Sequence, residues 1–251
     1  MYTHLKDIVR YVHDVGVFQN ILLAAKDDGE ALFQGMSTDG TLALRARYKT
    51  PLPQIRNQKI GVTRLDVLSA FLRSPAFNDA DGSAPKIEIV NRTGKEVVPS
   101  GIQLKSTYGH TAVFRFLSPT LTKSKITVTK SSAEVTDDDI NFVPDEKFFG
   151  DFKSFSAVLK KFNSTFSLEV KDDTLYMNLG EDDTACIPVN GIGEGFHINP
   201  TYTWSIDNFL RVLKQAPSME HVKIGISEEF GMIEVVIDDE NVTATYRLLH
   251  N

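Results

Sequence analysis

Apolar positions near the start of the chain follow the period of an α-helix. Leu5, Ile8, Val9 and Val12 recur at i, i+3, i+4 and i+7, which predicts an amphipathic helix over roughly residues 3–14. Seven further segments of the same half have the short length or the alternation that is typical of strands. These segments cover residues 20–25, 31–37, 42–48, 59–62, 86–91, 101–106 and 111–117.

A second helix is predicted between the fourth and the fifth of these strands. It begins at Thr63-x-x-Asp66, a start that resembles a capping box, and it ends near Pro75. Its inward-facing positions are Leu65, Leu68 and Leu72. The first half of the chain is therefore predicted to run helix, three strands, short strand, helix, three strands.

The second half repeats this order of elements. Helices are predicted at roughly residues 149–162 and at residues 205–215. Their buried stripes are Phe152, Phe155, Leu159 and Phe162 in the first, and Ile206, Phe209, Leu210 and Leu213 in the second. The predicted strands cover residues 166–170, 174–179, 184–189, 201–204, 221–227, 231–237 and 242–249.

Two matched segments close the two halves. Residues 111–117 and 243–249 share the pattern Thr-Ala-x-aromatic-Arg-x-Leu. The two closing segments are 132 residues apart in the sequence, and the second helices of the two halves are 141 residues apart. Small differences in loop length account for this difference in spacing. A matched order with matched closing strands indicates one unit built twice. The sequence therefore predicts a duplicated α+β fold with antiparallel sheets, each helix packing its apolar stripe on one sheet face.

The segment between the two halves has a different composition. Residues 118–144 are rich in Ser, Thr and Lys, contain one modest strand-like piece at 125–130, and carry the acidic run at 137–139. Such a segment between structured halves is typical of a connector. We therefore expect two domains, 1–117 and 145–251, joined by a connector over residues 118–144.

Charge is distributed unevenly along the chain. Residues 1–130 hold 18 Lys and Arg against 11 Asp and Glu, a net charge of +7, whereas the rest hold 9 against 22, a net charge of −13. Such polarity favours head-to-tail self-association or a nucleic-acid-binding face. A drift of surface charge between domains explains the composition equally well.

Basic residues concentrate on the outward faces of the four predicted helices. In the acidic half, five of the nine basic residues lie on the two helices. Helices of this kind suit a surface that holds a phosphate backbone without reading its bases. The alternative is that Lys and Arg are good helix formers on any solvated face. The candidate DNA-binding residues are Lys6, Arg10, Arg64, Arg73, Lys153, Lys160, Lys161, Arg211 and Lys214.

Patterns for catalysis, metals or cofactors are absent from the sequence. The six histidines lack zinc-type spacing, the acidic clusters lack the form of a calcium loop, and residues 190–195 lack the ending of a phosphate-binding loop. Cys186 lies in an apolar run, which predicts a buried structural thiol. We therefore expect no enzyme, no cofactor and no metal site. The single cysteine, together with the absence of a signal-peptide core and of a membrane-spanning apolar run, favours a cytoplasmic protein.

With tandem doubled domains, basic helices and a long connector, the chain resembles the DNA sliding clamps, the processivity factors of replicative polymerases. It is most similar to the two-domain, trimer-forming branch, which contains proliferating-cell nuclear antigen (PCNA) and the clamps of T4-like bacteriophages. The resemblance covers essentially the whole chain and rests on architecture. Residues 5–23 look most like the phage clamps, and residues 232–249 look like the end of either subfamily. The connector is longer than that of a phage clamp, and the second half is less basic.

The resemblance implies a homotrimer without enzymatic activity. Three subunits would join head to tail through edge strands into a closed ring. The helices would face duplex DNA and hold it loosely, independent of base sequence. The implied partners are double-stranded DNA, the replicative DNA polymerase and a clamp loader, in the host cell cytoplasm if the protein is phage-encoded.

Partners of this family dock a short peptide in a hydrophobic pocket beside the connector and the carboxy-terminal tail. By position, the resemblance implicates Leu121, Ile126, Val128, Leu248 and Leu249. Two alternatives stay open at this point. One is a monomeric or dimeric processivity factor of the herpesvirus type, with the same fold and an open DNA face. The other is a structural or interaction protein that uses the fold without DNA.

Overall fold

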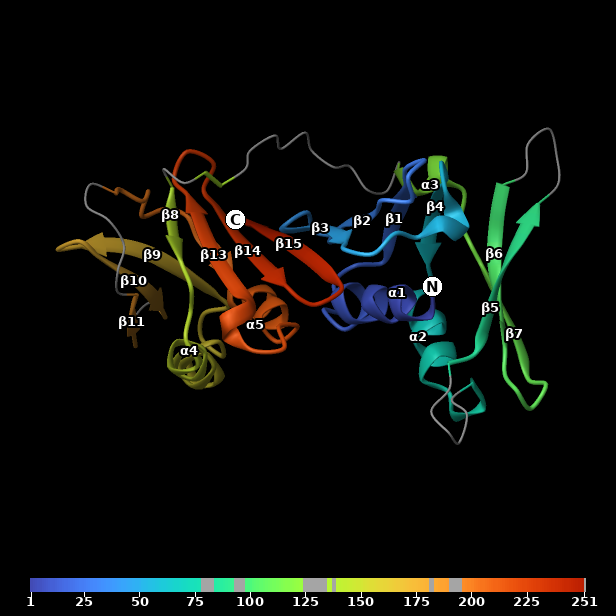
Figure 1. Ribbon diagram of the computed structural model, residues 1–251. Helices are drawn as coiled ribbons and strands as arrows, with labels where there is room; N and C mark the ends of the chain where they lie inside the picture. The colour runs from blue at the N-terminus through green and yellow to red at the C-terminus, as the bar shows by residue number, and fades with distance from the viewer. Residues whose placement is uncertain are drawn as a thin grey trace. The chain divides into compact units, whose positions relative to one another are not determined.

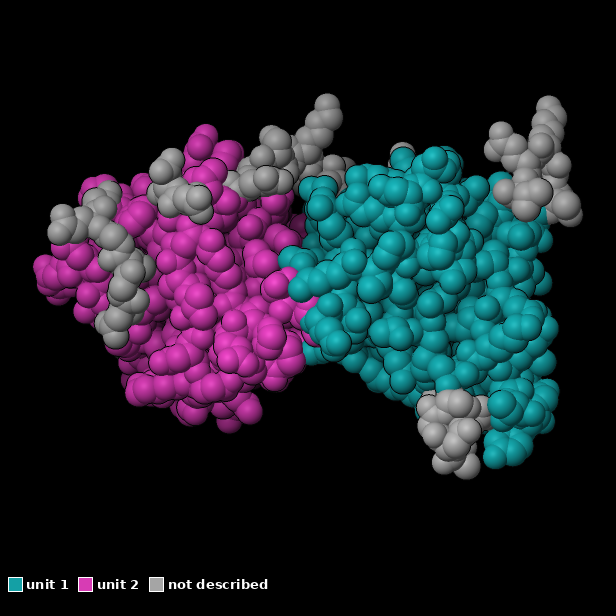
Figure 2. Space-filling model, viewed as in Figure 1, with its two compact units in different colours: residues 1–38, 45–128, 240–243 teal, residues 39–44, 129–239, 244–251 magenta. Residues whose placement is uncertain are grey.

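The chain folds into two compact units, which Figure 2 shows in different colours. The computed structural model describes residues 1–77, 84–92, 98–123, 135–136, 139–180, 183–189 and 196–250. Unit 1 comprises residues 1–38, 45–128 and 240–243, and unit 2 comprises residues 39–44, 129–239 and 244–251. The division at residue 128 falls inside the predicted connector. Each unit also includes a short piece of strand from the other half of the sequence.

The helices and strands of the first half follow the predicted order (Figure 1). They are α1 (Tyr2–Ile8), the π-helical η1 (Val9–His13), β1 (Asn20–Ala25), β2 (Ala31–Met36), β3 (Leu42–Tyr48), the 3-10 turn η2 (Pro53–Ile55), β4 (Lys59–Thr63), α2 (Leu65–Arg73), the 3-10 turn η3 (Pro75–Phe77), β5 (Lys86–Arg92), β6 (Val98–Lys105) and β7 (Thr111–Arg115).

The second half repeats that order after two short elements. These elements and their successors are α3 (Pro119–Lys123), β8 (Ile140–Phe142), α4 (Glu146–Leu159), β9 (Thr165–Lys171), β10 (Thr174–Leu179), β11 (Ala185–Val189), β12 (Thr203–Ser205), α5 (Ile206–Leu213), the 3-10 turn η4 (Met219–His221), β13 (Val222–Ser227), β14 (Met232–Asp238) and β15 (Val242–Leu249). The predicted α+β fold with antiparallel sheets and the duplicated order of elements are confirmed.

Unit 1 packs the first helix and α2 beside one another and against strands ordered β4-β1-β2-β3. In Figure 1 both helices lie beneath these strands, and the separate sheet β5-β6-β7 stands beside them. The predicted inward stripes of the two helices are buried: Leu5, Ile8, Val9, Val12, Leu65, Leu68 and Leu72. Because the apolar stripes face the sheet, the polar sides of both helices are turned toward solvent.

Unit 2 is held together by a cluster of aromatic rings. The Phe152 ring on α4 lies 5.0 Å from the Phe209 ring on α5 and 5.4 Å from the Phe166 ring on β9. Trp204 packs 5.9 Å from Phe166, and its buried indole N–H donates to the carbonyl of Gly231 at 3.1 Å. The strands of this unit are ordered β15-β14-β13-β8 and β11-β10-β9-β12. The cluster therefore joins both helices of the unit to β9 and β12.

Two elements in the predicted connector were not expected from the sequence. The first, α3, packs on β4 because Gly61 lacks a side chain. A Cβ atom there would lie 1.8 Å from the hydroxyl of the buried Thr122. Gly61 and Leu117 also exchange backbone hydrogen bonds of 3.1 and 2.8 Å. The second, β8, pairs with β13. The strand predicted at residues 125–130 lies outside the described residues.

The predicted buried stripe of α4 was wrong at two positions. Asp145 caps the helix by accepting from the Phe148 N–H at 2.6 Å, so α4 begins three residues before the predicted start. The buried stripe consists of Phe148, Phe152, Ser156 and Leu159. The predicted core residues Phe155 and Phe162 are 43% and 80% exposed. Their aromatic character predicted burial, but Phe155 lies on the outward side of α4 and Phe162 lies three residues beyond its end.

Two smaller predictions were also wrong. The capping box at the start of α2 is absent, because the N-cap is Arg64 in a left-handed conformation (φ 50°) without a side-chain cap. Cys186 was expected to be buried, but its thiol is exposed. On β11 the buried side chains are Ile187 and Val189, and strand alternation therefore turns Cys186 outward.

His4 is expected to make unit 1 less stable in mild acid. Its Nε2 lies 3.3 Å from the Thr50 carbonyl, and its buried Nδ1 has no hydrogen-bond partner among the described residues. Burial lowers the pKa of His4, partly offset by that backbone hydrogen bond. The unfolded chain therefore binds the proton more readily, and stability is lost as pH falls through the ordinary histidine range.

Amide hydrogen exchange in α1 and β3 would measure this effect. We expect protection to fall from about pH 7.5 to about pH 5.5, after correction for intrinsic exchange rates. The His4→Gln variant should show a flatter profile over the same range. An equal slope in the variant would assign the loss to other groups.

Candidate nucleic-acid interface

A groove between the first helix and α2 brings together three of the predicted DNA-binding residues. The groove has a volume of about 330 Å³, and Lys6, Arg10 and Arg73 line it with the acidic Asp7 and Asp14. Lys6 and Arg10 come from successive turns of the first helix, and Arg73 comes from the last turn of α2. The packing of two helices therefore concentrates cations that are far apart in the sequence.

Aromatic rings support two of these cations. The Lys6 ammonium lies 4.5 Å from the centroid of the Tyr2 ring, and the Arg10 guanidinium lies 5.1 Å from that of Tyr11. Cation–π contacts of this kind hold a side chain over a ring while leaving its donors directed to solvent. The rings therefore help to position both cations at the groove.

The third cation, Arg73, is paired with an acid. Its Nη2 donates to both carboxylate oxygens of Asp14, at 2.7 and 2.5 Å. His13 Nδ1 lies 3.0 Å from the same carboxylate. Because the pair is exposed, it contributes little to folding, but it orients the guanidinium and offsets its charge. A phosphate in the groove would compete with Asp14 for Arg73, which favours a loose contact.

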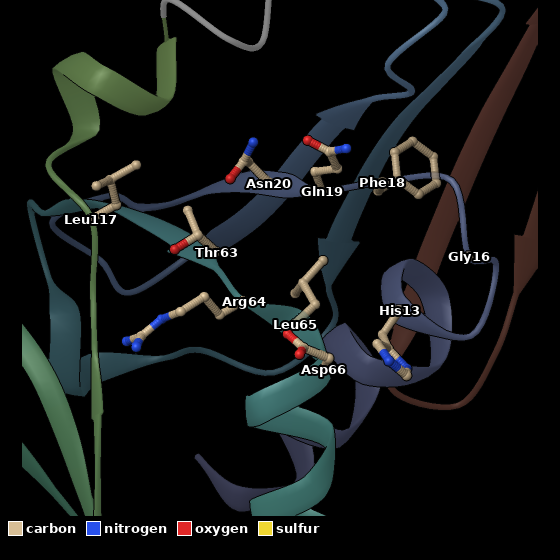
Figure 3. A pocket seen from close by; sticks show the side chains of 10 residues that line it. All are labelled: His13, Gly16, Phe18, Gln19, Asn20, Thr63, Arg64, Leu65, Asp66 and Leu117. Carbon is tan, nitrogen blue, oxygen red and sulfur yellow. The ribbon is translucent and has the colours of Figure 1, made fainter.

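Arg64 is not part of this groove. It precedes α2, whereas Arg73 ends that helix, and its guanidinium lies 5.6 Å from the Phe114 ring on β7. Figure 3 shows Arg64 at a different cavity, next to Thr63 and Leu65. The sequence predicted Arg64 and Arg73 on one helix. In the structure they lie at opposite ends of α2, and their side chains therefore line different cavities.

In unit 2 the predicted cations lie on the outer sides of α4 and α5. The five residues Lys153, Lys160, Lys161, Arg211 and Lys214 are exposed. Lys160 Nζ lies 3.1 Å from Asp207 Oδ1, which joins the end of α4 to the start of α5. Lys160 and Lys214 are also the C-caps of the two helices, where a positive charge complements the helix dipole. Part of the basic pattern therefore serves local stability.

The predicted peptide-pocket residues are placed unequally. Leu121 on α3 is 56% exposed, and Ile126 and Val128 lie outside the described residues. Leu248 is buried in the core, because alternation along β15 turns it inward. Leu249 is half-buried, and its N–H donates to the Thr41 carbonyl at 2.9 Å. Leu248 therefore supports the sheet and is not accessible to a partner in this structure.

An exposed apolar surface on α4 was missed by the sequence reasoning. Phe155 and Val158 on α4, and Phe162 three residues beyond its end, are 43%, 61% and 80% exposed. We call these three side chains the α4 apolar face. The sequence did contain a signal for this exposed surface. The α4 region carries more apolar residues than one buried helical stripe accommodates. Exposed contiguous apolar side chains of this kind mark interaction surfaces.

The remaining chemistry of the described residues is limited. In the part of the chain that the structure describes, no three His, Cys, Asp or Glu side chains are grouped to hold a metal ion. Among the described helices, none has the length and apolar character to cross a membrane. Lys147 donates to Asp151 at 2.6 Å, and that hydrogen bond raises the pKa of Lys147. The site's chemistry is therefore that of charged and apolar contacts.

Comparison with protein-family models finds no match, and no curated protein sequence matches the chain. Solved structures do match. One is the PCNA of A. fulgidus with the C-terminal region of FEN-1 bound, with a TM-score of 0.67 and 12% identity over 100% of this chain and 96% of that one. Another is the PCNA2–PCNA3 complex of Sulfolobus tokodaii, with a TM-score of 0.64 and 13% identity over 98% and 96%. At such identities the likeness concerns the fold: this chain has the two-domain fold of the PCNA sliding clamps.

Proposed function

We propose that the protein is a DNA sliding clamp, a head-to-tail ring that encircles duplex DNA and tethers the replicative DNA polymerase. The observation that carries this proposal is the groove of Lys6, Arg10 and Arg73 on the helices of a clamp fold. A clamp holds DNA topologically, so its own contacts to phosphate need only be weak. Exposed cations, partly offset by neighbouring acids such as Asp14 and Asp207, suit that requirement.

We propose that three copies form the ring through unlike surfaces. Strands β7 and β11 are outer strands of their sheets, and each presents backbone groups to a partner strand. Val113 on β7 is 42% exposed, and the α4 apolar face belongs to the helix that contacts β11. Pairing β7 of one copy with β11 of the next is a heterologous contact, which closes a ring when the rotation fits. The opposite net charges of the two halves favour the same head-to-tail order.

We propose that the polymerase and a clamp loader dock through short peptides near the connector and the end of the chain. Leu121 and Leu249 are the accessible members of the proposed pocket, and Ile126 and Val128 complete it in this proposal. The solved A. fulgidus PCNA has the C-terminal region of FEN-1 bound, which supports peptide docking on this fold. By the resemblance of residues 5–23, we assign the protein to the phage branch and to the host cell cytoplasm.

Charge reversal of the helices tests the DNA contact. Replacing Lys6, Arg10, Lys153 and Arg211 with glutamate should reduce loader-dependent stimulation of the polymerase on a primed circle by roughly tenfold or more, because each change replaces attraction to phosphate by repulsion. The matched control reverses four exposed basic residues on strands: Arg45, Lys59, Lys171 and Lys223.

The control variant has the same net charge and should retain stimulation. Equal activity of both variants and the wild type would favour a protein that uses the fold without DNA. Direct binding to linear DNA without a loader, falling steeply with salt, would favour the open herpesvirus-type factor.

A further inference from the structure

A cavity of about 600 Å³ lies in unit 1 beside the edge strand β4. Figure 3 shows its lining residues, which come from the end of the first helix, the loop before β1, the strands β1 and β4, the start of α2, and Leu117 just before the connector. Its apolar lining consists of Phe18 and Leu65, which are 6% and 4% exposed, and of the more exposed Leu117. The polar residues of the lining are His13, Gln19, Asn20, Thr63, Arg64 and Asp66. Polar groups and apolar side chains therefore meet in one concave site, as they do in binding sites.

The strand β4 pairs with β1 along its inner side, and on its outer side it makes one isolated bridge, between Gly61 and Leu117. On the inner side, Ala25 N–H donates to the Gln58 carbonyl at 3.0 Å, just before the strand begins. In an antiparallel ladder, alternate residues face the same neighbour, so Ile60 and Val62 also face β1. Gly61 faces outward, where it exchanges both backbone hydrogen bonds with Leu117. By the same alternation, the N–H and C=O of Thr63 also point outward.

Among the residues that the structure describes, none pairs with the outer side of Thr63. An antiparallel partner that places Leu117 opposite Gly61 would place Arg115 opposite Thr63. Arg115 is paired instead with Gly101 in the separate sheet β5-β6-β7. Among the described residues, none hydrogen-bonds to the outward N–H and C=O of Thr63. The cavity therefore lies where the next residues of an added strand would run.

Arg64 supplies the charge at this position. Its side chain is exposed and forms no ion pair with any described residue. It lies over the Phe114 ring, so the cation is held near the cavity. A carboxylate on an incoming ligand would form a charge-assisted hydrogen bond with the guanidinium. Asp66, also at the cavity, would repel a second acidic group or accept a donor.

We propose that this cavity binds an extended peptide of a partner protein, which adds to β4 at Thr63. One apolar side chain of the peptide packs against Phe18, Leu65 and Leu117, and an acidic side chain pairs with Arg64. Added strands gain affinity from the backbone and specificity from alternate side chains. This docking site is separate from the groove of Lys6, Arg10 and Arg73, and it does not depend on ring formation.

An array of blocked hexapeptides tests the proposal on the full chain. Each peptide carries one Leu or Phe. At every other position, Asp, Lys and Thr are compared in separate peptides. We expect the best Asp-containing peptides to bind roughly tenfold more tightly than their Lys counterparts, the effect of one charge-assisted hydrogen bond. The Arg64→Gly variant should lose this preference while keeping the backbone, because glycine accepts the positive φ. The control Arg73→Ala removes another arginine from α2 and should keep the preference.

N-methylation of the best peptide tests the strand geometry separately. A methyl group on the one backbone nitrogen that donates to the Thr63 carbonyl should abolish binding, because that N–H faces β4. Methyl groups at the adjacent nitrogens should be tolerated. The proposal is overturned if no peptide in the array binds, if Arg64→Gly keeps the acidic preference, or if methylation acts equally at every position.

Discussion

Replacing Phe152 with alanine is expected to lower the free energy of unfolding of unit 2 by about 3–5 kcal/mol. Phe152 is fully buried and packs against Phe166 and Phe209 with ring centroids 5.4 and 5.0 Å apart. Alanine would remove the aromatic contacts and leave a cavity at the junction of α4, α5 and β9. Because these rings join both helices to the sheet, the surroundings have little freedom to collapse into the space.

Fluorescence of Trp204 during denaturant unfolding measures this change. Trp204 is the chain's only tryptophan and packs on Phe166, so its emission reports unit 2. The matched control is Phe155→Ala on the same helix, where the ring is 43% exposed and the expected loss is below about 1 kcal/mol. Equal losses in the two variants would contradict the observed orientation of α4.

Replacing Phe155 and Phe162 together with glutamate is expected to convert the proposed trimer into single folded chains. Both rings belong to the α4 apolar face, and neither contributes much to the core of unit 2. Buried aromatic residues at interfaces each contribute about 2–4 kcal/mol to association, and two added carboxylates would have to be desolvated as well. We therefore expect the dissociation constant to rise by at least roughly a hundredfold.

Light scattering at micromolar concentration checks this result. The wild type should have a mass of about three chains of 28.0 kDa, and the double variant a mass of one. The control Phe230→Glu changes another exposed aromatic residue of unit 2, one that is 45% exposed and lies outside the α4 apolar face. The proposed interface is wrong if the double variant keeps the wild-type mass or if the control dissociates equally. A wild type that is itself monomeric would argue against the ring.

The loose character of the proposed DNA contact follows from how each cation is held. Lys6 and Arg10 lie over aromatic rings, and Arg73 and Lys160 are shared with Asp14 and Asp207. None of these arrangements fixes a cation in the bidentate geometry that would bind one phosphate at one position. Contacts of this kind attract the backbone without fixing a register, which is what sliding along DNA requires.

Most of the fold could be predicted because its signals are local. Apolar spacing predicted the stripes Leu5–Val12 and Leu65–Leu72, and short alternating runs predicted the strands, since both periods follow from backbone geometry. The predictions failed where the partner of a helix face decided the outcome. Phe155 has the same residue type as the buried Phe152, and only the position of the sheet against α4 separates them, whereas Phe162 is exposed because α4 ends at Leu159.

The sequence by itself determined the repeated unit. The closing strands share Thr-Ala-x-aromatic-Arg, and in the structure Phe114 and Tyr246 are both buried, because strand alternation alone turns them inward. Only the tertiary structure decided which charged groups act together. Arg73 meets Asp14 across 59 residues of sequence, while Arg64, just before the other end of α2, lies at a different cavity. Contacts between residues this far apart in the sequence depend on how helices and sheets pack. The spacing of apolar and polar residues along the chain does not determine that packing.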